Sequence, residues 1–205
     1  MIGCVGLFEK VPYEVFRAEA QKCPQLQSMC ENDAQFSKRA RGLYDALPLP
    51  MRATLGSAGY DFYAPFDFTI QPGESTIIPT GICADIPDGA VLIIAPRSGS
   101  GFKYGLRLAN SLGIIDSDFK NPNTGSVGHI MVRLMNHDHD EPVSFKAGDG
   151  FVQGVVLPFA TMPDYDNEQW ELRGVKDRIG GFGSTDEQEV EKPKRRKLFG
   201  TRRNN

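Results

Sequence analysis

The sequence contains no uninterrupted apolar run of the about 18 residues that a membrane-spanning helix needs. Its first ten residues turn from apolar to charged within a few positions and lack the basic start and long apolar stretch of a secretory signal peptide. Its four cysteines form no Cys-x-x-Cys pair, which disfavours a zinc site and favours free thiols in a reducing compartment. These absences predict a cytoplasmic protein without membrane contact.

Basic residues are scarce except at the C-terminal end. The segment 189–205 holds 7 of the 23 basic and 2 of the 26 acidic residues, so its net charge is about +5 and residues 1–188 carry about −8. A body that acidic disfavours a general nucleic-acid binder. We predict that 189–205 is a disordered basic tail. Two interpretations of Lys192 to Lys197 stay open: a solvated tail, which we favour, or a patch for nucleic acid or an import receptor, with nuclear import if the source is eukaryotic or viral.

Glycine is nearly absent from residues 13–47, where apolar side chains recur at roughly helical spacing. Pro24 divides the segment, which favours two short helices over one long helix. The apolar positions from Phe36 to Leu47 predict a further helix, ended by the prolines that follow. We expect residues 1–50 to form a helical N-terminal extension. It is either a partner-binding appendage or, as we favour, a cover on the main core.

Residues 51–160 consist of short apolar and β-branched runs separated by glycine and proline turns. Strand patterns that recur every 8–12 residues predict an all-β sandwich or barrel. Val91 to Ala95 is continuously apolar, so we expect it to be buried on both faces. Leu106 to Leu108 and Leu112 to Ile115 are expected to be the two arms of a hairpin.

The strand pattern fades in residues 161–188. Arg178 to Thr185 contains three glycines around one phenylalanine within a polar segment. Such a composition cannot build a packed element but suits a mobile flap that closes on a ligand.

Two short stretches carry groups suited to phosphate chemistry. Arg97, Ser98 and Gly99 supply a guanidinium fork, a hydroxyl and an unhindered backbone amide, which suit phosphate binding, although an ordinary turn has the same composition. Asp116 follows an apolar strand and can orient and deprotonate a water molecule, although an Asx-type turn explains it equally well. The residues alone leave both alternatives open.

Histidines suggest a metal at first sight. His137 and His139 share one face of an extended chain, but the surrounding asparagine, aspartates and proline are hairpin-loop residues, so we favour a loop. His129 stands alone beside a strand, and we interpret it as structural.

Five motifs in order resemble those of the trimeric dUTPase family (dUTP diphosphatases). The resemblance spans about residues 53–186, and the order of the motifs makes it specific. The motifs are Gly56 to Phe62, Pro96 to Gly99, Asn110 with Gly113 to Phe119, Gly148 to Gln153, and Gly180 to Thr185.

The resemblance implies a dUTPase-like jelly-roll or β-clip barrel and a homotrimer with shared active sites. It implies hydrolysis of dUTP to dUMP and pyrophosphate by attack of water on the α-phosphorus, with Mg2+ on the triphosphate. Such an enzyme limits uracil incorporation into DNA and supplies dUMP for dTMP synthesis.

The resemblance also implies roles for individual residues. Asp116 matches the general base, and Asp61 matches a carboxylate that holds Mg2+ through water. A uracil pocket selects its base by shape and by donor and acceptor pattern. The matching substrate-binding residues are Arg97, Ser98, Gly99 and Gln153 for phosphate, Asn110, Gly113 and Ile114 for uracil, Phe119 for the sugar, Phe182 for stacking on the base, and Arg178, Gly183, Ser184 and Thr185 in the flap.

The sequence departs from the family pattern at several points. Phe119 replaces a common tyrosine but keeps a ring that would crowd a ribose 2′-hydroxyl, and Gly150 replaces a common arginine. Arg178 stands one residue closer to the double glycine than usual. Residues 120–127 resemble an insertion after the third motif.

Two other functions on the same fold stay open as alternatives. A dCTP deaminase needs a glutamate in the third-motif hairpin, where this chain has Asp116 and no nearby glutamate. A dUTP-sensing regulator would use the flap and the helical extension, but the intact set Asp116, Arg97 and Gln153 favours catalysis.

Overall fold

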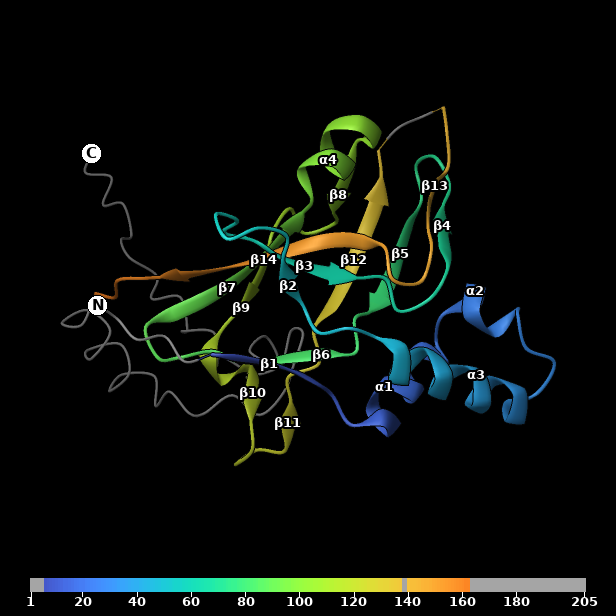
Figure 1. The fold of residues 1–205 in the computed structure, drawn as a ribbon, viewed down its shortest axis with the longest axis horizontal. Helices are drawn as coiled ribbons and strands as arrows, with labels where there is room; N and C mark the ends of the chain where they lie inside the picture. Colours follow the sequence, from blue (N-terminus) through green and yellow to red (C-terminus); the bar gives the residue numbers. More distant parts are fainter. Residues whose placement is uncertain (1–5, 138–139, 163–205) are drawn as a thin grey trace, which may run out of the picture.

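The computed structural model describes residues 6–137 and 140–162 (Figure 1). Strands dominate, and helices cluster near the N-terminal end. The elements are β1 (Leu7–Lys10), α1 (Tyr13–Ala20), α2 (Pro24–Gln27), α3 (Asp33–Ala46), β2 (Met51–Arg52), β3 (Tyr60–Tyr63), β4 (Phe68–Ile70), β5 (Ser75–Pro79), β6 (Ile82–Asp85), β7 (Ala90–Pro96), α4 (Ser98–Tyr104), β8 (Leu106–Leu108), β9 (Gly113–Ile115), the 3₁₀ helix η1 (Ser117–Phe119), β10 (Lys120–Asn121), β11 (Ser126–Val127), β12 (Met131–Asn136), β13 (Val143–Phe145) and β14 (Gly150–Pro158).

The largest sheet runs β2-β3-β14-β7-β9, and a three-stranded sheet runs β5-β12-β8. The pairs β4–β13, β1–β6 and β10–β11 complete the described strands, and the pairing is antiparallel. This confirms the all-β fold class. None of these sheets closes into a barrel within the part of the chain that the structure describes.

The N-terminal segment packs onto the strands as a cover. Figure 1 shows α1, α2 and α3 gathered at one end of the molecule. Phe16, Leu26 and Phe36 are buried in the same apolar cluster as the residues of the sheets. The side chain of Asn32 caps α3 by accepting a hydrogen bond from the Gln35 amide at 3.0 Å.

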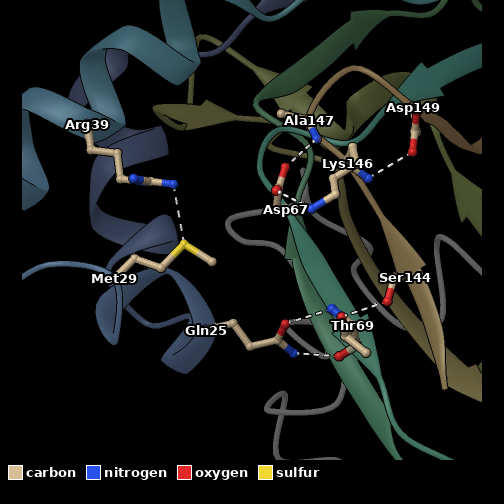
Figure 2. Close-up of polar contacts among 9 residues, drawn as sticks. All are labelled: Gln25, Met29, Arg39, Asp67, Thr69, Ser144, Lys146, Ala147 and Asp149. Atoms are coloured by element: carbon tan, nitrogen blue, oxygen red, sulfur yellow. Dashed lines mark hydrogen bonds and ion pairs between the residues drawn. The ribbon is translucent and has the colours of Figure 1, made fainter.

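Gln25 in α2 also seals the edge of a strand. Its side-chain Nε2 donates to the Thr69 carbonyl at 2.7 Å, and the Thr69 amide donates to its Oε1 at 2.7 Å (Figure 2). The amide group therefore satisfies the free edge of β4, whose other edge pairs with β13. Unpaired strand edges invite association with other chains, so this contact protects the fold.

Three parts of the chain differ from the sequence-based expectation. β8 and β9 are strands, but they are not the arms of one hairpin: β8 pairs with β12 and β9 pairs with β7. β7 is not uniformly buried, because Leu92 and Ile94 are buried while Val91 and Ile93 are half-buried. The residues after Arg97, which the sequence left open as a phosphate-binding segment or an ordinary turn, form helix α4.

The described cysteines, Cys23, Cys30 and Cys83, are free thiols. Burial, with a smaller effect from Glu19, raises the pKa of the Cys23 thiol to about 11. A thiol with such a pKa stays protonated near neutral pH and acts as a small apolar group.

No helix among the described residues is long and apolar enough to cross a membrane.

His129 is a buried histidine that ties two segments together. Its Nε2 accepts a hydrogen bond from the Gly81 amide at 3.0 Å, so the ring proton lies on Nδ1. The Nδ1 atom is buried without a hydrogen-bond partner among the described residues. Burial lowers the pKa of His129 from 6.5 to about 4, against a smaller opposing effect of Glu19. The folded protein therefore holds this ring in its neutral form.

We predict that His129 makes the fold sensitive to acid. Its pKa is about 6.5 unfolded and about 4 folded, so the unfolded chain binds the extra proton first and the free energy of unfolding falls as pH falls through this window. The loss reaches about 3 kcal/mol, the equivalent of the pKa difference. Urea denaturation of wild type and His129→Gln between pH 7 and pH 4 measures it. The variant keeps an acceptor for the Gly81 amide but does not titrate, so parallel pH profiles would contradict the prediction.

Candidate functional site

Arg97 lies at the centre of a polar cluster at one end of the five-stranded sheet. It follows β7 and precedes α4. Its Nε lies 2.9 Å from Oδ1 of Asp61 in β3, and its Nη1 donates to the Gly150 carbonyl in β14 at 3.0 Å. The Asp61 side chain is 15% exposed and that of Arg97 is 40% exposed. The guanidinium is therefore held by a mostly buried carboxylate while part of it faces solvent.

Gln153 belongs to the same cluster. The β14 register places it opposite Asp61 on one side and Ala95 on the other. Its Nε2 donates to the Pro96 carbonyl at 3.0 Å, immediately before Arg97. The sheet therefore brings together the residues that the first, second and fourth motifs predicted.

Ser98 and Gly99 open α4 beside this cluster. Both are exposed, and the space next to Gly99 is open. A hydroxyl, unhindered backbone and a partly exposed guanidinium side by side suit the oxygens of a polyphosphate.

Gly150 explains how Arg97 reaches its position. A Cβ at residue 150 would lie 2.7 Å from Nη1 and 3.0 Å from Cζ of Arg97, so the guanidinium occupies the space that a side chain would take. From the sequence, Gly150 could be identified only as a departure from the family pattern. Its contact with Arg97 could not be predicted, because the two residues are 53 positions apart and meet across the sheet.

The residues predicted to contact the base and the sugar line a separate cavity. Asn110, Gly113 and Ile114, predicted for the base, and Phe119, predicted for the sugar, contribute to a cavity of about 1030 Å³ whose other lining residues are largely apolar. Phe119 is buried, whereas the Ile114 side chain is 63% exposed at the cavity. An apolar cavity with a few polar groups is typical of a site for a small organic ligand.

Asp116 is exposed and follows β9 at the start of η1. Ile115 lies opposite Leu92 in β7, and the strands run antiparallel, so Asp116 lies beside Val91. Arg97 is six residues farther along β7, which corresponds to about 20 Å at the rise of a β-strand. Within one chain the structure does not bring Asp116 to the Arg97 cluster.

The five predicted flap residues, Arg178, Phe182, Gly183, Ser184 and Thr185, lie outside the described residues. Asp138 and His139 lie outside them as well. Among the residues that the structure does describe, no group of three or more His, Cys, Asp or Glu side chains could hold a metal ion.

Comparisons with known proteins identify relatives over most of the chain. The dUTPase family matches residues 45–185. The deoxyuridine 5′-triphosphate nucleotidohydrolase of Lactococcus lactis subsp. lactis (strain IL1403) is 41% identical over 137 residues, which cover 67% of this chain and 87% of that protein. The enzyme of the same name from Shewanella piezotolerans (strain WP3 / JCM 13877) is 42% identical over 144 residues, covering 66% and 85%.

A solved structure is also similar. The crystal structure of a dUTPase from Streptococcus mutans shares 39% sequence identity, with a TM-score of 0.49, and the match covers 56% of this chain and 88% of that one.

We predict that Gly150→Ala weakens triphosphate binding with little effect on stability. The new Cβ would push Arg97 away from Asp61, and a long side chain can move without disturbing the core. Loss of one charge-assisted hydrogen bond corresponds to about tenfold weaker dUTP binding. Calorimetric titration with a non-hydrolysable dUTP analogue measures the change. Gly42→Ala in α3, where a Cβ meets open space, is the control, and wild-type affinity in Gly150→Ala would refute the steric argument.

Proposed function

The chain belongs to the dUTPase family and hydrolyses dUTP, and we propose that it does so as a homotrimer whose active sites are each built from more than one copy. The observation that carries the proposal is the distance between the two halves of the site. The phosphate-binding cluster around Arg97 and the carboxylate of Asp116 lie at opposite ends of β7. A second copy that presents its Asp116 to the Arg97 cluster would complete the site.

Exposed apolar residues at the cavity support an assembly. Ile77, Leu112 and Ile114 line the cavity and are 50%, 49% and 63% exposed. Apolar groups gathered at a concave surface favour contact with another protein surface over contact with water. Closed cyclic assemblies satisfy such a surface in every copy.

The phosphate half holds the substrate by charge and hydrogen bonds. Arg97 offers a guanidinium already oriented by Asp61 and the Gly150 carbonyl, so little side-chain freedom is lost when a phosphate binds. Ser98 and Gly99 supply a hydroxyl and unhindered backbone. Gln153, held by the Pro96 carbonyl, adds an amide on the same side.

The other half of the site selects the nucleoside. We assign uracil to Asn110 and to the backbone from there to Ile114. Asn110, Leu112, Gly113 and Ile114 line the cavity. A pocket closed around uracil leaves no room for the methyl group of thymine and presents the wrong hydrogen-bond pattern to cytosine. Phe119, buried next to this segment, is assigned to the sugar, where its ring excludes a 2′-hydroxyl.

Asp61 is the described residue that fits a role in holding Mg2+. Its carboxylate is paired with Arg97 and is not part of a group of acidic ligands among the described residues, so direct coordination by a protein cage is not available there. Mg2+ commonly keeps several waters and binds through one carboxylate and the substrate phosphates. When bound to the triphosphate, the ion would neutralise charge on the phosphate oxygens.

Asp116 supplies the general base. Its carboxylate takes a proton from a water molecule while the water oxygen forms a bond to the α-phosphorus. The bond between the α-phosphorus and the bridging oxygen breaks, and pyrophosphate leaves with the electron pair. The exposed position of Asp116 at the end of β9 lets the carboxylate reach a substrate held by the neighbouring copy.

We predict that Asp116→Asn abolishes turnover but preserves binding. Removal of a general base lowers the rate by about 10²–10⁴-fold, whereas the amide retains the size of the side chain. Pyrophosphate release is measured with dUTP, dCTP, dTTP and UTP, with and without Mg2+, and dUTP affinity is measured by calorimetry. Wild-type turnover in the variant would refute the role of Asp116, and ammonia release from dCTP would identify a deaminase instead.

A second prediction tests the sharing of sites. Asp116→Asn and Arg97→Ala are each expected to be inactive, because each removes one half of every site. When the two variants are denatured together and refolded in equal amounts, about a quarter of the sites should combine an intact Asp116 with an intact Arg97 from different copies. Recovery of about a quarter of wild-type activity supports shared sites. No recovery above the separate variants would mean that one chain supplies both residues.

A further inference from the structure

The residues directly after Phe119 form a small hairpin that is anchored to the N-terminal strand. β10 and β11 pair antiparallel, with Lys120 opposite Val127. Figure 1 shows this hairpin projecting beside β1 and β6. It coincides with residues 120–127, which the sequence predicts to be an insertion.

The ammonium of Lys120 bridges two carboxylates. Its Nζ lies 2.5 Å from Oε2 of Glu9 and 2.9 Å from Oδ1 of Asp85. The Lys120 side chain is 23% exposed, and its partners are 48% and 50% exposed. The Lys120 side chain is therefore largely covered, while its ammonium meets the two carboxylates near the surface.

The ladder between β1 and β6 sets the spacing of the two carboxylates. Glu9 lies opposite Cys83, and Asp85 is two residues farther along β6. Residues two apart on a strand share a face, so Glu9 and Asp85 are diagonal neighbours on one side of the pair. The backbone pairing of β1 with β6 therefore sets the spacing of these two residues independently of Lys120.

The backbone on either side of Lys120 is held as well. The Ser126 hydroxyl donates to the Phe119 carbonyl at 2.7 Å. Gly128, at φ +63°, passes so close that a Cβ there would lie 2.9 Å from the Lys120 Cα. A residue with a side chain would be strained by that φ and blocked by that contact. The backbone that follows Phe119 is therefore held in place by these two contacts.

The cluster of Lys120, Glu9 and Asp85 is better suited to positioning the neighbouring Phe119 than to stabilising the fold. Burial tends to lower the pKa of Lys120, but its hydrogen bonds to Glu9 and Asp85 outweigh this and raise the pKa above its ordinary value, so the ammonium stays charged. Ion pairs with half-exposed partners contribute little to the free energy of unfolding. A charged group held by two fixed carboxylates instead restricts where the neighbouring ring can lie.

We propose that the cluster of Lys120, Glu9 and Asp85 is a positioning device for sugar selection. It holds Phe119 in the place where the ring excludes a ribose 2′-hydroxyl. The N-terminal strand β1, which lies outside the range matched by the dUTPase family, thereby contributes to the choice of substrate. The inference rests on the proposed contact between Phe119 and the deoxyribose.

The test compares hydrolysis of dUTP and UTP by Lys120→Met. Methionine keeps much of the apolar stem but removes the charge, so Phe119 gains freedom and the ratio of kcat/KM for dUTP to that for UTP should fall about tenfold, as small displacements of positioning groups cost at least that much. Lys120→Arg retains a cation for both carboxylates and should keep the ratio within about threefold of wild type.

Matched variants separate positioning from stability. Arg17→Met removes an ion pair with Asp33 whose arginine is 24% exposed, close to the 23% of Lys120, but which joins α1 to the start of α3. It should leave the ratio unchanged. Glu9→Gln removes one acceptor at the surface while Asp85 still pairs with the ammonium, and it should lower the ratio in the same direction even if Lys120→Met does not fold.

The outcomes are distinct. A wild-type ratio in folded Lys120→Met, or in Glu9→Gln if Lys120→Met does not fold, overturns the inference and leaves dUTP hydrolysis untouched. An equal fall in Arg17→Met would also overturn it, because the effect would then follow from loss of any such ion pair. A wild-type protein without dUTP hydrolysis would overturn the proposed function and the inference together.

Discussion

The antiparallel ladder between β7 and β14 is the constraint on which the site depends. It runs from Val152 opposite Pro96 to Pro158 opposite Ala90, so β7 is paired over its whole length. One end of β7 leads into Arg97, and the other end lies beside β9 and Asp116. This pairing places the Arg97 cluster and Asp116 far apart in each chain. Our proposal that a second copy completes the site rests on this separation.

The helical extension and the strands share one core. Phe16, Leu26 and Phe36 are buried with residues of the sheets, Gln25 pairs with the backbone of Thr69, and β1 pairs with β6. Burial of three such side chains contributes several kcal/mol in total, at about 1.5–3 kcal/mol each. An appendage built mainly to bind a partner would not need to be embedded in this way. The extension is a structural part of the described protein.

The sequence predicted the fold class and the Arg97 cluster better than the pairing of strands. Asp61, Arg97 and Gln153 could be grouped because their motifs occur in a familiar order. In the structure Arg97 pairs with Asp61, and Gln153 donates to the carbonyl of Pro96, the residue before Arg97. Strand periodicity is a local property of the sequence, but strand pairing is not. The sequence therefore predicted that β8 and β9 pair with each other, whereas they pair with β12 and β7. The role of Gly150 depends on a contact across two strands, which no local pattern reveals.

Two features outside the common pattern meet at one point of the fold. β1 precedes the range matched by the family, and residues 120–127 resemble an insertion; Lys120 joins them beside Phe119. The partners of Arg97, by contrast, are Asp61 and the Gly150 carbonyl, both in strands within the matched range. Phosphate binding is the same for any nucleoside triphosphate, whereas the sugar and base distinguish one substrate from another. Under the proposed roles of Phe119 and Arg97, additions anchored behind Phe119 would adjust selectivity while the phosphate half keeps its geometry.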